Sequence, residues 1–196
     1  NIVYMGMGEP LDNYENVLKS IEILTSSWAM AMSPKRITVS TCGFLPHLKD
    51  FLDSTQVHIA ISLHNMIPNE RQEIMPIEKA YKIEDVIELL KQYDWTGQRR
   101  LTFEYIVFKN LNDDYRHIFS LVSNLSDIEC RINLIRFHTI PNTIFQQADD
   151  KDMIKIRDIL TSKGLIATIR ASRGEDILAA CGLLSTKKLL SLPVKN

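Results

Sequence analysis

Short apolar runs alternate with longer amphipathic stretches along most of the chain, and this alternation constrains the fold more than any other sequence feature. The runs are rich in β-branched and aromatic residues, and most of them end at glycine, proline or small polar residues, as buried strands do. We therefore predict six strands, at 2–7, 36–40, 57–63, 101–108, 132–137 and 165–170.

The stretches between these strands carry apolar residues at helical spacing, which indicates amphipathic helices. The clearest stripes are Val17, Ile21 and Leu24 in a first helix, and Ile83, Val86, Ile87 and Leu90 within 82–93. Asp12 or Asn13 can serve as the N-cap of the first helix. Further helices are predicted around 48–52, at 115–125, at 149–163 with Gly164 as its stop, and at 176–184.

Strands that alternate with helices in this way form βα units and a parallel sheet, whose strands we expect to be buried on both faces. We find no internal repeat, low-complexity tract or linker, so residues 1–196 are predicted to form one domain of the α/β class. The pattern alone leaves a barrel-like closure and an open, doubly wound sheet as alternatives. In both architectures, ligands bind at the carboxyl ends of the strands.

The composition is that of an ordinary soluble domain, with 45% hydrophobic and 24% charged residues among 196. There is no apolar run of the roughly 18 residues needed to span a bilayer and no signal-peptide pattern, so we expect a cytoplasmic protein. We also expect a monomer. Three cysteines are too few and too scattered for a disulfide framework. The net charge of −1 argues against nucleic-acid binding by overall charge, but a local basic patch stays possible.

Small polar and ionisable residues follow most of the predicted strands, as a site for a polar, charged ligand requires. They are Gly6-Met7-Gly8-Glu9-Pro10, Ser40-Thr41-Cys42-Gly43, Ser62-Leu63-His64-Asn65, Arg136-Phe137-His138 and Arg170-Ala171-Ser172-Arg173-Gly174. Each has an ordinary structural explanation, such as a turn at Gly8-Glu9-Pro10 or a local turn bond from Ser40. Glu9 could instead pair with an ammonium group, next to backbone that the glycines leave open to a ligand. No spacing matches a zinc, EF-hand or Walker motif.

The cysteines differ in their surroundings. Cys130 precedes a strand and is expected to be a small buried residue, and burial is also favoured for Cys42. Cys181 lies in Ala179-Ala180-Cys181-Gly182, where small neighbours leave the sulfur accessible. Accessibility alone does not make a thiol reactive, because reactivity needs thiolate character.

Taken together and in this order, the motifs resemble the radical-SAM dual-specificity ribosomal and transfer RNA adenine-C2 methyltransferases. The residues that carry the resemblance are 6–10, 36–43, 61–64, 132–135, 170–177 and 179–182, which extend along nearly the whole chain. The resemblance implies a partial, TIM-like (β/α)6 radical-SAM barrel that lacks its first strand here. It further implies S-adenosylmethionine bound against a [4Fe-4S] cluster, with ribosomal and transfer RNA as partners.

The resemblance also implies roles for individual residues. Gly8 and Glu9 would hold the methionine amino group of S-adenosylmethionine. Further pocket contacts would come from Ser40, from Ser62, Leu63 and His64, and from His138, where the family commonly has asparagine. Cys181 would be the catalytic cysteine that carries the methyl group before radical addition to C2 of adenine. Leu183 stands where the family often has glutamine.

The cluster ligands are the largest departure from the family pattern. A Cys-x3-Cys-x2-Cys segment is needed, and Cys42, Cys130 and Cys181 are too far apart to form it. We expect that the segment, the N-terminal RNA-binding domain, the general base and the resolving cysteine precede Asn1 in a longer parent. The 196 residues alone are then expected to bind no cluster, to hold no metal and to be inactive.

Three other functions are considered. An adenine-C8 RNA methyltransferase would share the mechanism, but residues 8–10 and 172–174 look more like the C2 family. A non-catalytic RNA-binding module could use the scattered arginines, yet it has no evident need for Cys181 or Glu9. A barrel aldolase would need a Schiff-base lysine inside a strand, and none of the predicted strand cores contains a lysine.

Overall fold

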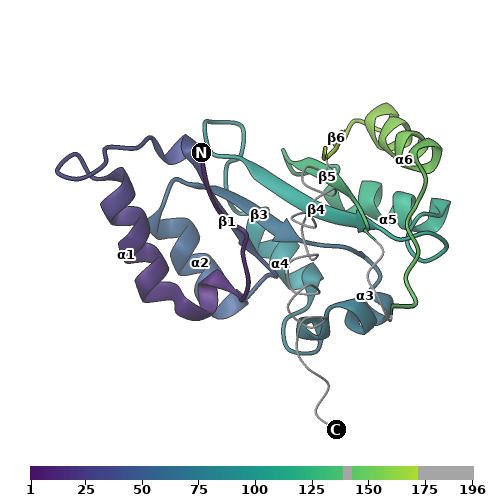
Figure 1. Cartoon of the computed structure of the whole chain (residues 1–196), viewed down its shortest axis with the longest axis horizontal. Coiled ribbons are helices and arrows are strands. Elements are labelled where there is room, and N and C mark those ends of the chain that lie inside the picture. The colour runs from purple at the N-terminus through teal and green to yellow at the C-terminus, as the bar shows by residue number, and fades with distance from the viewer. Residues whose placement is uncertain (139–142, 172–196) are drawn as a thin grey trace, which may run out of the picture.

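The computed structural model describes residues 1–138 and 143–171. Six parallel strands form one sheet with helices between them (Figure 1). The strands are β1 (Ile2–Tyr4), β2 (Ile37–Thr41), β3 (His58–Ser62), β4 (Leu101–Val107), β5 (Arg131–Arg136) and β6 (Ile166–Ile169). The helices are α1 (Tyr14–Thr25), α2 (Leu45–Ser54), α3 (Pro68–Ile74), α4 (Ile83–Leu90), α5 (Tyr115–Leu125) and α6 (Asp150–Ser162). The described residues also include three short 3-10 helices, η1 (Pro10–Asn13), η2 (Pro34–Arg36) and η3 (Pro76–Lys79). All six predicted strands are present, although β1 ends at Tyr4 instead of Met7.

The strand order decides between the two architectures that the sequence left open. The order is β1-β2-β3-β4-β5-β6, so each strand pairs with the next one along the chain. In a doubly wound sheet, the chain would instead start near the middle of the sheet and add strands first on one side and then on the other. Because parallel crossovers are right-handed, sequential order places the connecting helices on one side of the sheet. The result is a sector of a (β/α) barrel with β1 and β6 at its edges, which confirms the partial barrel.

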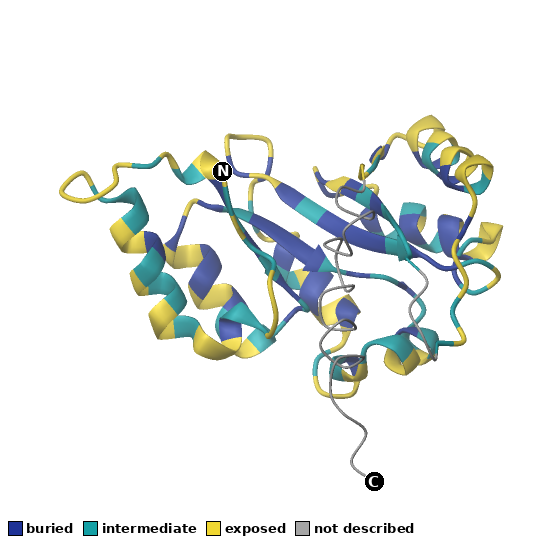
Figure 2. Ribbon diagram, viewed as in Figure 1, coloured by how far each residue is buried: buried dark blue, intermediate teal, exposed yellow. Residues whose placement is uncertain are grey.

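One face of the sheet forms the hydrophobic core with the helices. Its side chains include Val39, Ile61, Phe103 and Leu134, each with no solvent exposure. The core continues into α4 through Ile83, Val86, Ile87 and Leu90, the helical stripe predicted from the sequence. Figure 2 shows this burial concentrated along the strands and on the helix surfaces that meet them.

The other face corrects the expectation that the strands are buried on both sides. It carries the alternate residues Ser40, Ser62, Asn133 and Ile135, which are only partly buried. The parallel register aligns Ser62 with Glu104, Glu104 with Asn133, and Asn133 with Thr168, so polar groups form a row across β3 to β6. A barrel strand has one face toward the helices and the other toward the barrel interior, where a ligand can bind.

Two helix starts are capped by an aspartate side chain, and the start of α1 is not. Asp114 and Asp149 accept hydrogen bonds from the backbone amides of His117 and Asp152 at the starts of α5 and α6. At α1 the N-cap is Asn13, whose side chain makes no capping bond. The residue that caps a helix here is Glu9, at η1. The predicted N-cap position at Asn13 is therefore confirmed, but its side chain makes no capping bond, because the chain enters α1 through a 3-10 turn instead of an extended segment. No helix in the two described segments is long and apolar enough to cross a membrane.

Candidate functional site

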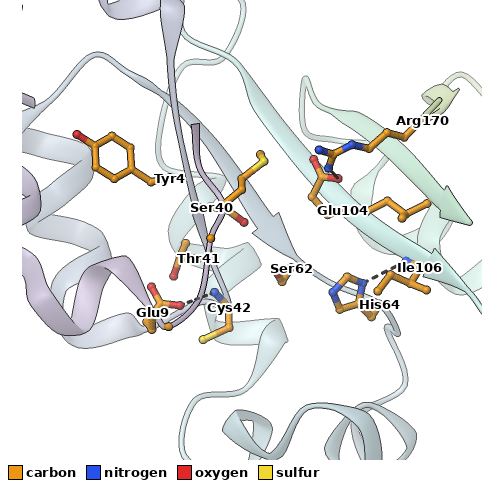
Figure 3. A pocket seen from close by; sticks show the side chains of 14 residues that line it. Tyr4, Glu9, Ser40, Thr41, Cys42, Ser62, His64, Glu104, Ile106 and Arg170 are labelled. Atoms are coloured by element: carbon orange, nitrogen blue, oxygen red, sulfur yellow. Dashed lines mark hydrogen bonds and ion pairs between the residues drawn. The ribbon is translucent and has the colours of Figure 1, made fainter. Parts of the chain in front are cut away.

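A cavity of about 430 Å³ lies at the carboxyl ends of the strands, on the polar face of the sheet. This is the position at which parallel α/β proteins bind ligands. Figure 3 shows Glu9 and Glu104 at opposite sides of the cavity, with Ser40, Cys42 and Ser62 between them. The lining residues are Tyr4, Met5, Gly6, Gly8, Glu9, Ser40, Thr41, Cys42, Ser62, His64, Glu104, Ile106, Ile135 and Arg170.

Glu9 is fixed by two backbone amides. Its Oε1 accepts from the amide of Leu11 at 3.0 Å and its Oε2 accepts from the amide of Cys42 at 2.8 Å. The second bond ties the loop after β1 to the end of β2. A carboxylate oxygen accepts more than one hydrogen bond, so both oxygens retain capacity for a cationic ligand.

Gly8 allows the backbone conformation of the loop that follows β1. Its φ of +88° lies in the left-handed region, which residues with a side chain rarely adopt. A Cβ built at Gly8 would meet no atom within 4 Å, so it would project into open space where Gly8 lines the cavity. Glycine therefore keeps this part of the cavity free for a ligand.

His64 has a constrained backbone and a neutral ring. Its φ is +56°, and its carbonyl accepts from Nδ2 of buried Asn112 at 2.7 Å, which stabilises the unusual conformation. The ring Nδ1 accepts from the amide of Ile106 at 3.1 Å, so the proton of the neutral ring is on Nε2. Burial, assisted by the positive charge of Arg71, lowers the pKa of His64 to about 4. His64 is thus a neutral hydrogen-bond donor at the cavity.

Arg71, from α3, holds the carboxyl ends of β2 and β3 together. Its side chain is fully buried, and Nη2 donates to the carbonyls of Cys42 at 3.2 Å and Ser62 at 3.0 Å. Nε donates to the carbonyl of Leu63 at 3.0 Å, and Nη1 pairs with Glu78 at 2.5 Å. Three backbone carbonyls beside the cavity therefore depend on one guanidinium group. Neither Arg71 nor α3 was predicted from the sequence.

Glu104 lies in the polar row on β4 and is also new relative to the sequence analysis. Its side chain is buried, and Oε1 accepts from Nδ2 of Asn133 at 2.9 Å. Its Oε2 is buried without a hydrogen-bond partner, and the nearest cation is Nη1 of Arg170 at 3.7 Å. Burial raises the pKa of Glu104 above its usual value, against the opposing effects of Asn133 and Arg170.

The two described cysteines are protonated thiols at neutral pH. Burial raises the pKa of Cys130 to about 12 and confirms it as a small core residue. Cys42 lines the cavity and is partly buried, and burial together with the nearby Glu9 carboxylate raises its pKa to about 12. Neither has the thiolate character of a reactive cysteine. Cys181 lies outside the described residues.

The structure brings five of the seven predicted cofactor-binding residues to the cavity: Gly8, Glu9, Ser40, Ser62 and His64. The side chain of Leu63 is buried in the core on the opposite face, because neighbouring strand residues alternate in direction. His138 follows β5 and is not among the residues that line the cavity. In residues 1–138 and 143–171, no group of three histidine, cysteine or acidic side chains could hold a metal ion.

Comparisons with known proteins agree with this fold. A profile of the radical SAM superfamily matches residues 1–122. The chain is 56% identical over 188 residues to a probable dual-specificity RNA methyltransferase RlmN of Parabacteroides distasonis, covering 96% of this chain and 55% of the relative. A protein of the same name from Porphyromonas gingivalis strain W83 is 54% identical over 196 residues, covering all of this chain and 57% of the relative. The chain thus spans about half the length of these relatives.

Solved structures show the same arrangement. The crystal structure of a radical SAM methyltransferase from Sphaerobacter thermophilus has a TM-score of 0.87 and 36% identity, over 93% of this chain and 54% of that one. A domain of pyruvate-formate lyase-activating enzyme from Bacteroides vulgatus has a TM-score of 0.66 at 17% identity, over 86% of this chain and 98% of that one, and shares the fold alone.

Fold and site together define a partial (β/α) barrel with a polar ligand cavity at the carboxyl ends of its strands. The chain belongs to the radical SAM superfamily. Membership implies in general that S-adenosylmethionine and an iron–sulfur cluster take part.

Proposed function

We propose that this chain is the S-adenosylmethionine-binding part of an enzyme that methylates C2 of adenine in ribosomal and transfer RNA. The observation that carries the proposal is the cavity between Glu9 and Glu104, in a chain 56% identical to a protein named as a dual-specificity RNA methyltransferase. Such an enzyme would act in the cytoplasm, where its RNA substrates are, and we propose a monomer. Residues 1–196 would form one barrel domain whose C-terminal extension includes Cys181.

The described residues fit S-adenosylmethionine. The cavity offers a carboxylate for an ammonium group at Glu9, neutral donors at His64 and the serines, and open space at Gly8. It also contains a buried acceptor without a partner, Glu104 Oε2. By the family resemblance, Gly8 and Glu9 hold the amino group, while Ser40, Ser62, Leu63, His64 and His138 complete the pocket. For Leu63 the contact would come from its backbone, since its side chain is in the core.

The described residues do not fit an iron–sulfur cluster. Cys42 and Cys130 lie in different parts of the fold, and no ligand group of three is present among the described side chains. Cluster ligands are therefore proposed to come from outside the described part of the protein.

The substrate explains why radical chemistry is needed. The C2–H bond of adenine is not acidic and C2 is not nucleophilic. An ordinary polar methyl transfer to C2 is therefore not feasible, and a cofactor must supply radical chemistry. S-adenosylmethionine supplies both a methyl group and, at a cluster, an organic radical. Within this chain, Glu9 would fix the amino end of the cofactor, His64 would donate from Nε2, and Cys181 would carry the methyl group.

The proposal is tested by digesting RNA treated with the full-length enzyme to nucleosides and separating them by chromatography against 2-methyladenosine and 8-methyladenosine standards before mass analysis. We expect 2-methyladenosine in ribosomal and transfer RNA. A methyl group at C8 would identify the related adenine-C8 activity instead. Cys181→Ala is the matched control, since RNA binding should survive while methylation disappears. Unchanged methylation by this variant would contradict the carrier role, and an enzyme that binds RNA without methylating it would be a binding module.

A further inference from the structure

Glu104 is the one described carboxylate that has a buried oxygen without a hydrogen-bond partner. The residue is 5% exposed and its other oxygen is held by Asn133 at 2.9 Å. Asn133 is itself held by Thr168, which donates to its Oδ1 at 2.7 Å. The carboxylate is thus oriented by a chain of hydrogen bonds and leaves one acceptor position open at the cavity. A buried acceptor without a partner is costly, so a partner from the ligand is expected.

The surroundings of Glu104 indicate which part of a ligand would meet it. Two residues further along β4 on the same face is Ile106, which pairs in register with Ile135 on β5, and both line the cavity. Two neighbouring isoleucines provide an apolar surface suited to one face of a flat base. Ser62 is in register with Glu104 on the other side. An apolar surface beside an oriented carboxylate matches a nucleoside, whose base is flat and whose ribose carries two hydroxyl donors.

The two ends of the cavity have different chemistry. Glu9 is bound by two backbone amides at one side, whereas Glu104 with its free oxygen lies at the opposite side (Figure 3). S-adenosylmethionine likewise has an ammonium group at one end and a ribose with its base at the other. An ammonium group at Glu9 therefore directs the ribose toward Glu104.

We propose that Glu104 accepts a hydrogen bond from the ribose hydroxyls of bound S-adenosylmethionine and thereby sets the orientation of its adenosyl group. The inference rests on the proposed function, because it takes S-adenosylmethionine as the ligand. A simpler explanation is that Glu104 only balances the charge of Arg170. Their separation of 3.7 Å exceeds a hydrogen bond, and the Arg170 side chain is 40% exposed, so this contact leaves the Oε2 acceptor unused.

The test measures the dissociation constant of each of several ligands for the wild-type full-length enzyme and for its variants, by equilibrium dialysis. The ligands are S-adenosylmethionine, its 2′-deoxy and 3′-deoxy analogues, and an analogue without the adenine amino group. Loss of a hydrogen bond to a charged group weakens binding by about 10-fold to 100-fold. We expect a loss in this range for at least one deoxy analogue with the wild-type protein. Glu104→Gln should weaken S-adenosylmethionine similarly and no longer discriminate against that analogue.

Thr102→Val is the matched control, since Thr102 lies on the same strand and face but does not line the cavity. This variant should keep wild-type discrimination. Equal discrimination by Glu104→Gln and wild type would overturn the inference while leaving the cofactor site intact. Coupling of Glu104 to the analogue without the amino group would overturn it as well, by placing the base edge at Glu104. Failure of the wild-type enzyme to bind S-adenosylmethionine would instead contradict the proposed function.

Discussion

The two faces of the sheet come from the same six strands but differ in what their side chains do. On the helix-covered face, Ile61 and Phe103 have no solvent exposure and belong to one hydrophobic cluster. One position away on the same strands, Ser62 and Glu104 line a cavity. Because successive strand residues point to opposite faces, stability and ligand binding are separated at single-residue spacing. Substitutions on the two faces should therefore have different consequences.

The largest effect on stability is expected at Arg71, which donates hydrogen bonds to the carboxyl ends of both β2 and β3. Arg71→Met would leave the carboxylate of Glu78 buried without its cation and would free the carbonyls of Cys42 and Ser62. Removing one partner of a buried ion pair destabilises a protein by about 4 kcal/mol. We expect this loss in the free energy of unfolding, measured by urea denaturation.

The double variant Arg71→Met/Glu78→Leu separates the ion pair from the backbone contacts. Replacing a buried pair by apolar residues is often nearly neutral, so the double variant should recover much of the lost stability. It should still bind S-adenosylmethionine weakly, because the carbonyls of Cys42 and Ser62 at the ends of β2 and β3 still lack the hydrogen bonds from Arg71. Full recovery of binding would show that Arg71 has no positioning role.

On the helix-covered face, Ile61→Ala should remove about 3 kcal/mol of stability, through lost burial and the cavity left behind. Thr102→Ala on the polar face should cost less than about 1 kcal/mol, because Thr102 is only partly buried. Thermal and urea unfolding of both variants measure the contrast. Similar losses at the two positions would contradict the division between the faces.

The stability of the protein should depend on pH through His64, which lies at the cavity. Its folded-state pKa of about 4 is below its ordinary value of 6.5, so folding disfavours the protonated ring. The stability that depends on the neutral ring is therefore present above about pH 6.5 and is lost as the pH falls toward 4. The loss should be about 2 kcal/mol, after allowing for the partial exposure of the residue.

His64→Asn is the corresponding variant, since asparagine tolerates the left-handed backbone and its side chain does not titrate. Its unfolding free energy should depend less on pH between 6.5 and 4 than that of the wild type. Identical pH profiles would show that His64 is not buried as described.

A small effect on stability is expected at Glu104, and its sign is opposite to the others. Burial raises the pKa of Glu104, so the ionised form is disfavoured in the folded state. Stability then falls as the pH rises from the ordinary pKa of 4.5 through the raised value. Glu104→Gln should stabilise the ligand-free protein at pH 7 by about 1 kcal/mol, and the gain should vanish at low pH. A destabilised variant at pH 7 would indicate that the pairing with Arg170 dominates.

Much of the fold followed from the sequence because each strand is a short apolar run between turn residues. The burial of both faces was predicted wrongly, although β4 contains the contrary signal: Thr102 and Glu104 alternate with Leu101, Phe103 and Tyr105. Period-two alternation of this kind indicates a strand with one polar face. Applied to β4, it would have found Glu104.

Other parts of the site had no sequence signal. Arg71 donates to backbone carbonyls of Cys42, Ser62 and Leu63, and carbonyls are the same at every position. Its importance depends on the path of the chain after β3, which places α3 beneath the strand ends. Leu63 was included in the pocket with its neighbours Ser62 and His64, and only the direction of its side chain separates it from them.

We propose that the polar face of this sheet orients S-adenosylmethionine between Glu9 and Glu104. A crystal structure of the full-length enzyme with S-adenosylmethionine tests it most directly. We expect the amino group within hydrogen-bond distance of Glu9 and a ribose hydroxyl within hydrogen-bond distance of Glu104 Oε2. The opposite orientation of the cofactor, or a ribose bound elsewhere while Glu104 Oε2 stays unpartnered, would contradict it.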